Sequence, residues 1–186
     1  QVTYNQQQTT VADYMLPALG VALSDIDNDG DLDIYIANDS ERNLFFNNLK
    51  HWSFKEQAIE SGLAYSENGR AQAGMGVDAA DYDEDGDIDF YVTNFSDDVN
   101  TLYQNQGNGT FIDNTYAAGL GSIIRPYLGW ATGFYDFDRD GDLDIFVANG
   151  HIYPQLNTFS DGLSYPQVNL LYRNESGYYK NVVNPL

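Results

Sequence analysis

Three short runs of the sequence concentrate the residues that could do chemistry. Each run has nine residues, with Asp at positions 1, 3, 5, 7 and 9 and Gly at position 6: DIDNDGDLD (25–33), DYDEDGDID (81–89) and DFDRDGDLD (136–144). Carboxylates a few Å apart repel one another, and salt screens this repulsion only in part. Solvent, protons or a bound cation must therefore offset the repulsion in each run.

A calcium ion matches this spacing best. Ca²⁺ takes six to eight hard oxygen ligands at flexible geometry, whereas Mg²⁺ demands a tighter octahedron and Zn²⁺ prefers His and Cys. In each run positions 1, 3 and 5 would supply carboxylates, position 7 its main-chain carbonyl, and position 9 would close the site. The predicted metal-site residues are Asp25, Asp27, Asp29, Asp31, Asp33, Asp81, Asp83, Asp85, Asp87, Asp89, Asp136, Asp138, Asp140, Asp142 and Asp144. We predict about three bound Ca²⁺ ions, one per run.

Two other interpretations of the runs are weaker. An EF-hand needs Glu at the twelfth place of its loop, but Ile36, Val92 and Val147 stand there. A solvated turn rich in Asp and Gly is common for one isolated match, yet it is much less expected for three matches with Gly in register. The sequence therefore favours a metal loop placed between two strands.

The segments around each run are expected to be strands that hold the loop. ALGVALSD, GMGVDAAD and GWATGFYD precede the runs, and DIYIAN, DFYVTN and DIFVAN follow them. The latter are β-branched and aromatic, and too short for helices. NLFFNN (43–48), NTLYQN (100–105) and NLLYRN (169–174) come next, each before a turn and a fourth strand-like segment. Each repeat thus holds four short strands.

The spacing of the runs indicates a repeat architecture. The first Asp of successive runs is separated by 56 and then 55 residues, and a four-stranded antiparallel sheet repeated in this way is the blade of a β-propeller. We predict an all-β fold, a single partial β-propeller over residues 1–186 with blades at about 18–63, 74–120 and 129–183. Residues 1–17 would be an extension or the end of a preceding blade.

Three blades are too few to close a ring, which normally needs four to eight. Both outer blades would leave apolar faces uncovered, and the chain begins QVTYNQQQTT with neither an initiator Met nor a leader, which suggests a processed or partial chain. We expect an arc of a larger propeller, completed by its remaining blades or by another protein subunit. An insertion at 150–168 lengthens the third repeat.

Composition excludes several functional classes. With 42% hydrophobic residues the chain can build a core, although its net charge is −20. Only eight Lys and Arg residues are present, which argues against a nucleic-acid partner and an anionic membrane surface. No stretch is long enough for membrane insertion. Of the 28 acidic residues, 16 lie in the runs, where a cation would keep them ionised and unsuited to general acid catalysis.

The repeated pattern resembles a known family. DxDxDGDxD between short strands, followed by N-x-L-[FY]-x-N and a G-x-[FY] hairpin, resembles the FG-GAP or VCBS repeat of integrin-like β-propellers. VANGHIYP (147–154) and PQVNLLYRN (166–174) are similar to the bacterial group related to cartilage acidic protein, which often carries an ASPIC/UnbV domain. The resemblance implies a secreted or surface-exposed propeller with structural Ca²⁺, and an ASPIC/UnbV segment is absent here.

These observations favour a non-catalytic module for binding, adhesion or assembly, stabilised by calcium and acting through protein–protein contacts. We expect an extracellular, cell-surface or periplasmic location, where Ca²⁺ is abundant enough for weak sites. Two alternatives stay open: a Ca²⁺-dependent propeller of a polysaccharide-active enzyme, and a lectin-like module that binds a glycan. Tyr153, Phe159 and Tyr165 in the insertion would be the sugar-stacking residues of the second alternative.

Overall fold

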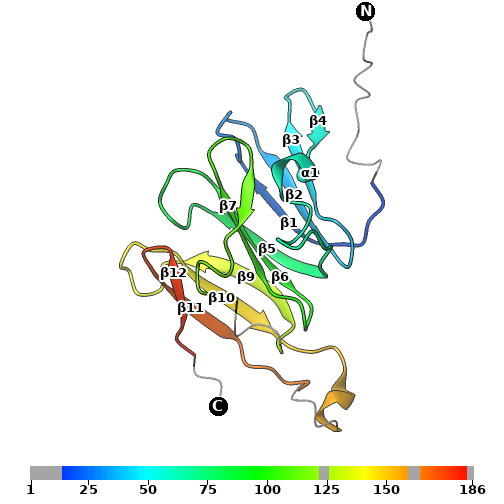
Figure 1. Cartoon of the computed structure of the whole chain (residues 1–186), viewed down its shortest axis with the longest axis vertical. Helices are drawn as coiled ribbons and strands as arrows, with labels where there is room; N and C mark the ends of the chain where they lie inside the picture. The colour runs from blue at the N-terminus through cyan, green and yellow to red at the C-terminus, as the bar shows by residue number, and fades with distance from the viewer. Residues whose placement is uncertain (1–13, 122–125, 159–163, 184–186) are drawn as a thin grey trace, which may run out of the picture.

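The chain folds into three four-stranded antiparallel sheets, each a simple meander (Figure 1). The structure, a computed structural model, describes residues 14–121, 126–158 and 164–183. The first sheet contains β1 (Ala18–Ser24), β2 (Asp33–Asn38), β3 (Leu44–Asn48) and β4 (Phe54–Glu56). The second contains β5 (Gly74–Ala80), β6 (Asp89–Asn94), β7 (Thr101–Asn105) and β8 (Phe111–Asp113). The third contains β9 (Gly129–Tyr135), β10 (Asp144–Asn149), β11 (Leu170–Glu175) and β12 (Tyr178–Asn181).

The predicted all-β class and its propeller blades are confirmed by this topology. We call the three sheets the first, second and third blade. In each blade the acidic run connects the first strand to the second, and the pairs that flank it are Ser24 with Asp33, Ala80 with Asp89, and Tyr135 with Asp144. Each loop is therefore fixed at both ends by the same ladder of hydrogen bonds.

Neighbouring blades meet along their first strands, β1, β5 and β9, which lie next to one another in that order (Figure 1). A Cβ atom at Gly20 would lie 2.4 Å from the main-chain oxygen of Met75, and one at Gly76 would lie 2.2 Å from that of Trp130. Such distances are too short for a side chain. Glycine at these two positions therefore permits direct backbone packing between blades.

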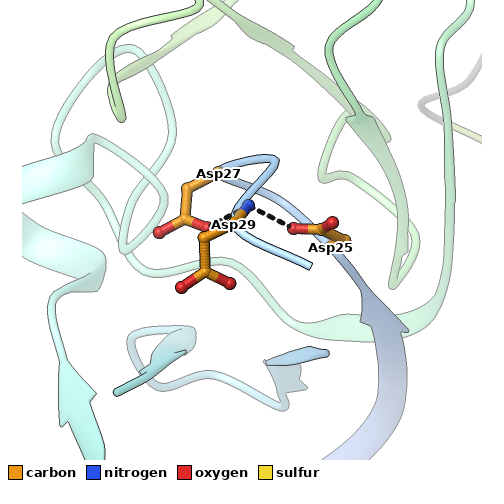
Figure 2. Close-up of side chains that lie close together, drawn as sticks. All are labelled: Asp25, Asp27 and Asp29. Atoms are coloured by element: carbon orange, nitrogen blue, oxygen red, sulfur yellow. Dashed lines mark hydrogen bonds between the residues drawn. The ribbon is translucent and has the colours of Figure 1, made fainter. Parts of the chain in front are cut away.

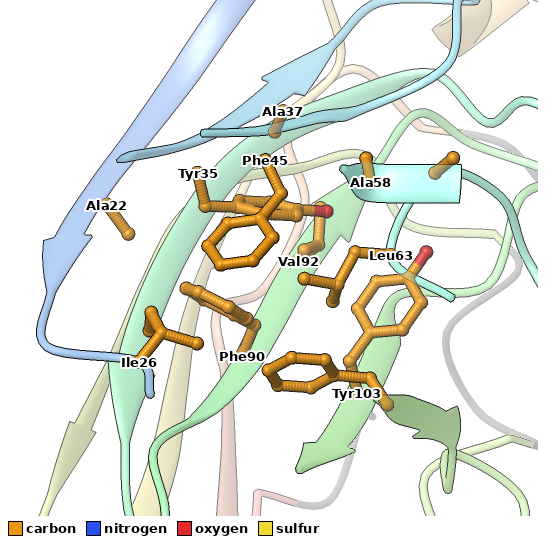
Figure 3. Close-up of a cluster of buried hydrophobic side chains, with 12 residues drawn as sticks. Ala22, Ile26, Tyr35, Ala37, Phe45, Ala58, Leu63, Phe90, Val92 and Tyr103 are labelled. Atoms are coloured by element: carbon orange, nitrogen blue, oxygen red, sulfur yellow. The ribbon is translucent and has the colours of Figure 1, made fainter. Parts of the chain in front are cut away.

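Two hydrophobic cores fill the spaces between the blades. The first core lies between the first and second blades, where Tyr35 stacks on Phe90 with ring centroids 4.5 Å apart (Figure 3). The second core lies between the second and third blades and includes Tyr91, Phe134 and Tyr172. Aromatic side chains thus supply much of the apolar area that each blade buries against its neighbour.

The two outer blades each leave one face incompletely covered. On the first blade, Leu19, Val21 and Leu23 of β1 are 55%, 62% and 59% exposed. The Tyr14 ring covers part of this face, because it packs edge-on against Phe46 at 5.4 Å. On the third blade, Tyr135 of β9 is exposed. The second blade, which has a neighbour on each side, buries every residue of β6.

Two short helical segments were not predicted from the sequence. The helix α1 (Ala58–Ser61) follows β4 and places Ala58 in the first core. The 3₁₀ helix η2 (Pro154–Thr158) lies in the insertion of the third blade. Within the described ranges no helix is both long and apolar enough to cross a membrane.

Candidate metal centres

The three acidic loops share one hydrogen-bonding pattern. In the first loop the Asp25 carboxylate accepts the N–H groups of Asp29 (3.0 Å) and Gly30 (3.0 Å), as Figure 2 shows in part. Asp81 accepts the corresponding N–H groups of the second loop at 3.0 and 2.9 Å, and Asp136 those of the third loop at 3.2 and 3.3 Å. The side chain at position 1 therefore folds each loop back on itself.

The backbone of each loop has the same unusual conformations. Gly30, Gly86 and Gly141 at position 6 have φ angles of 90°, 94° and 104°. Residues with a Cβ atom rarely adopt such angles, which explains why Gly recurs there. The residues at position 4 are also left-handed, with φ of 59° to 64° at Asn28, Glu84 and Arg139.

Positions 1, 3 and 5 bring three carboxylates together in every loop. Within each triad, one ligand atom from each residue lies within 4.8 Å of the others (Figure 2). The triads are Asp25, Asp27 and Asp29; Asp81, Asp83 and Asp85; and Asp136, Asp138 and Asp140. Clustered carboxylate oxygens are the donor set that a hard divalent cation prefers. Each triad could therefore hold a metal ion.

Side-chain amides from the third strand orient the carboxylate at position 3. Asn47 Nδ2 donates to Asp27 Oδ2 at 2.6 Å, and Gln104 Nε2 donates to Asp83 Oδ2 at 2.5 Å. Asn47 and Gln104 immediately precede the last Asn of the N-x-L-[FY]-x-N motif. The sequence interpretation missed them, because their contact with the loop depends on how the hairpin folds.

The Asp83 carboxylate carries an oxygen that lacks a well-aligned partner. Asp83 Oδ1 is buried and forms no well-aligned hydrogen bond with the described residues, although the N–H of Asp85 interacts with this carboxylate. Desolvation by burial raises the pKa of Asp83 above its ordinary value. A buried carboxylate oxygen without a well-aligned donor is costly unless a proton or a cation satisfies it. The second triad therefore fits a bound cation well.

The carboxylates at position 9 have a different environment from the triads. Asp33 Oδ2 accepts the N–H of Ile26 (2.9 Å), and its Oδ1 accepts the N–H of Asn48 (2.8 Å). Asp89 and Asp144 repeat this arrangement. All three are buried, and desolvation raises the pKa of Asp33 to about 6 and that of Asp89 to about 7. These carboxylates join the loop to the third strand, and their role as metal ligands stays a prediction.

The carboxylates at position 7 of the first and third loops contact the hairpin between the third and fourth strands, whereas that of the second loop contacts the first loop. Asp31 pairs with Lys50 at 3.3 Å, Asp142 accepts the N–H of Ser176 at 2.9 Å, and Asp87 accepts an amide N–H from Asn28 at 3.0 Å. The contact between Asn28 and Asp87 joins the first loop to the second. Coordination by the position 7 carbonyl stays a prediction.

Asparagine side chains tie the first and second loops to the next blade. Asn105 of the second blade donates to the carbonyl oxygens of Ile26 (3.2 Å) and Ile88 (3.1 Å). Asn174 of the third blade donates in the same way to Tyr82 (3.0 Å) and Leu143 (3.2 Å). A single buried amide thus holds the loop of its own blade and the loop of the preceding blade.

His151 is packed in a way that does not activate a nucleophile. The ring is 7% exposed, its Nδ1 accepts the N–H of Tyr153 at 3.2 Å, and its Nε2 lies 3.3 Å from Ser96 Oγ. Because Nδ1 accepts a hydrogen bond, a neutral ring carries its proton on Nε2 and donates it to Ser96. A general base would instead accept the proton of the hydroxyl.

The fold and the loops together define a class of protein: propeller blades that each carry an acidic loop suited to a cation. The FG-GAP-like repeat matches residues 25–92 and 81–147. Each match begins at the first Asp of one acidic run and ends in the strand that follows the next run. The chain belongs to the FG-GAP-like repeat family.

A mouse (Mus musculus) protein, cartilage acidic protein 1, is similar to this chain. The two are 32% identical over 97 residues, which cover 52% of this chain and 14% of the mouse protein. The chain therefore matches only a small part of that relative's length. This similarity, over 52% of the chain, confirms the predicted resemblance to a group related to cartilage acidic protein.

Proposed function

We propose that this chain is a calcium-stabilised, non-catalytic module for extracellular binding, adhesion or assembly through protein–protein contacts. One Ca²⁺ ion would bind in each loop, through the carboxylates at positions 1, 3 and 5 and the carbonyl at position 7, with position 9 closing the site. The observation that carries the proposal is the clustering of three carboxylates in each of three identically folded loops. The buried oxygen of Asp83, which forms no well-aligned hydrogen bond with the described residues, supports it.

The ions would stabilise the loops and, through them, the contacts between blades. Asn105 and Asn174 each connect two successive loops, so a loop that a cation holds rigid also holds its neighbour. A rigid surface loses less entropy when it binds a partner. Weak calcium sites with dissociation constants on the order of 10⁻⁴ to 10⁻³ M are typical of extracellular modules, which supports a secreted, cell-surface or periplasmic location.

The uncovered faces of the first and third blades support a partner on each side. We propose that the blades at about 18–63, 74–120 and 129–183 form an arc, and that further blades or another protein subunit cover Leu19, Val21 and Leu23 on one side. Contiguous exposed apolar side chains mark such interaction surfaces. A protein that stays monomeric at high concentration and binds no apolar dye would contradict this part of the proposal.

Calcium binding is tested by native mass spectrometry and by thermal unfolding with and without EDTA. We expect about three bound Ca²⁺ ions. Saturating Ca²⁺ at about a hundred times the dissociation constant stabilises the fold by about 2.7 kcal/mol per independent site. For a chain of this size, each kcal/mol raises the melting temperature by about 2–4 °C. An unchanged melting temperature together with the absence of bound ions would refute the proposal.

A further inference from the structure

The three loops differ in the charge that they carry. The first run contains five acidic residues and no basic one, and the second has six acidic residues because Glu84 occupies position 4. The third run has five acidic residues, but Arg139 occupies position 4. Glu84 and Arg139 are both exposed and have the same left-handed backbone, with φ of 61° and 64°. The side chain at position 4 therefore changes the loop charge without changing the loop fold.

A built-in ammonium group lies beside the first loop. Lys50 Nζ is 3.3 Å from Asp31 Oδ2 and 3.9 Å from Asp29 Oδ2, and Asp29 belongs to the first triad. The corresponding hairpin residue of the second blade is Gly107, which has no side chain. This ammonium group already interacts with the carboxylates and repels a second cation, so it opposes the binding of a metal ion to the first triad.

A guanidinium group replaces the orienting amide in the third blade. Arg173 occupies the place in β11 that Asn47 and Gln104 occupy in β3 and β7. Arg173 pairs with Glu175, and a weaker attraction reaches Asp138 and Asp140 of the third triad. The third blade therefore carries a positively charged side chain at the strand position where the other two blades carry a neutral amide.

The second triad is also the least hydrated of the three. Asp81 and Asp83 are partly buried, whereas all three carboxylates of the third triad are exposed. Position 2 shows the same difference, because Tyr82 is 2% exposed and Phe137 is 53% exposed. A charge pair that is shielded from water interacts more strongly than one on the surface. The second loop therefore carries more acidic charge, is less hydrated, and has no adjacent cationic side chain among the described residues. All three features favour tighter Ca²⁺ binding in this loop.

We infer that the loops form a graded series, in which the second loop binds Ca²⁺ most tightly and the first and third are weakened by Lys50, Arg139 and Arg173. This inference rests on the proposed calcium binding. At intermediate Ca²⁺ concentrations only the loop of the second blade, the blade that lies between the first and the third, would be occupied. Occupation of the outer loops would follow at higher concentrations.

The gradient is measured by a Ca²⁺ titration followed with NMR, using the amide signals of Gly30, Gly86 and Gly141 as one reporter for each loop. We expect the Gly86 signal to reach its midpoint at a Ca²⁺ concentration about three- to tenfold lower than the other two signals, the effect of one or two surface charges. Raising the ionic strength should narrow the difference, because salt screens exposed charges.

A matched pair of substitutions isolates the charge at position 4. Glu84→Arg should raise the midpoint of Gly86 by about three- to tenfold, and Arg139→Glu should lower that of Gly141 by a similar factor. Lys50→Asn should lower the midpoint of Gly30 by about two- to fivefold, since Asn is neutral and tolerates the left-handed backbone at this position. Arg70→Gln removes a positive charge from the connection between the first two blades, and should move none of the three midpoints.

The outcomes separate the inference from the proposed function. Three glycine signals that respond to Ca²⁺ with one common midpoint, or a Gly86 signal that responds last, would overturn the gradient and leave calcium binding intact. Midpoints that stay unchanged when Lys50, Glu84 and Arg139 are substituted would also overturn the gradient. Signals that do not respond to Ca²⁺ at all would overturn both.

Discussion

The second blade and the two outer blades have the same topology but different surroundings. In β6 of the second blade all six residues are buried, because the first blade covers one face and the third blade covers the other. In β2 of the first blade, Ile34 and Ile36 are partly exposed, and in β10 of the third blade Phe146 and Ala148 are partly exposed. A blade of this fold therefore gains burial from each neighbour that it has.

This difference also extends to the loops. The loop of each blade is held by an Asn of the following blade, so the first and second loops have this support within the described residues. Phe137 in the third loop is exposed, while Ile26 and Tyr82 at the same position are buried. Since repeat proteins gain stability from interfaces between neighbours, substitutions at matched positions should have unequal effects in different blades.

The largest difference is expected in the second strands. Tyr91→Ala removes a fully buried ring from the second core and should lower the free energy of unfolding by about 3–5 kcal/mol. Phe146→Ala alters the same register position on the uncovered face of the third blade, and should cost no more than about 2 kcal/mol. Urea denaturation measures both, and equal losses would contradict the comparison.

The backbone contact between first strands gives the next largest effect. Gly76→Ala forces a Cβ atom against the carbonyl oxygen of Trp130, and should cost about 1–3 kcal/mol because overpacked atoms must move apart. Ala131 occupies the same place in the third blade and is exposed, so Ala131→Gly should change the free energy of unfolding by less than about 1 kcal/mol. A Gly76→Ala protein of unchanged stability would refute the contact.

The amide link between blades should have a smaller effect. Asn105→Ala leaves the carbonyl oxygens of Ile26 and Ile88 without this donor, and should cost about 1–2 kcal/mol because both are part of a buried network. Asn48→Ala is the matched control, since the Asn48 amide donates only to Leu32 within its own blade. Thermal unfolding should show a clearly smaller loss for Asn48→Ala, and the reverse order would argue against the link.

The stability of the metal-free protein should also depend on pH. Burial raises the pKa of Asp33 to about 6 and that of Asp89 to about 7, so protonation favours the folded state. The stabilisation is full below the unfolded pKa of about 4 and is lost as the pH rises through these values. In EDTA the melting temperature should fall by a few degrees between about pH 5 and about pH 8. If calorimetry finds that the melting temperature rises over this pH range, the raised pKa values of Asp33 and Asp89 are contradicted.

Much of the fold could be predicted from the sequence because its signals are local. The strands after the acidic runs follow from short β-branched and aromatic segments, and the hairpin at Gly107 and Gly109 follows from turn residues whose φ angles are 68° and 79°. The helix α1 was missed because four residues are too few to show a helical period.

The candidate sites were only partly predictable. Asp and Gly at fixed spacing indicated each triad, since the backbone of a tight loop brings alternate side chains to one place. The separate environment of Asp33, Asp89 and Asp144 was not visible in the spacing, because their partners at Asn48, Asn105 and Asn174 belong to a strand that folds back from later in the chain.

The sequence by itself determined the loops, the strands and the repeat, since these depend on residue types within a few positions of one another. Only the tertiary structure decided which carboxylates lie next to a positively charged side chain, which carboxylates are shielded from water, and which faces of the blades stay uncovered. Burial and electrostatic energy depend on distances between atoms that are far apart along the chain. Three nearly identical runs can therefore become three unequal sites.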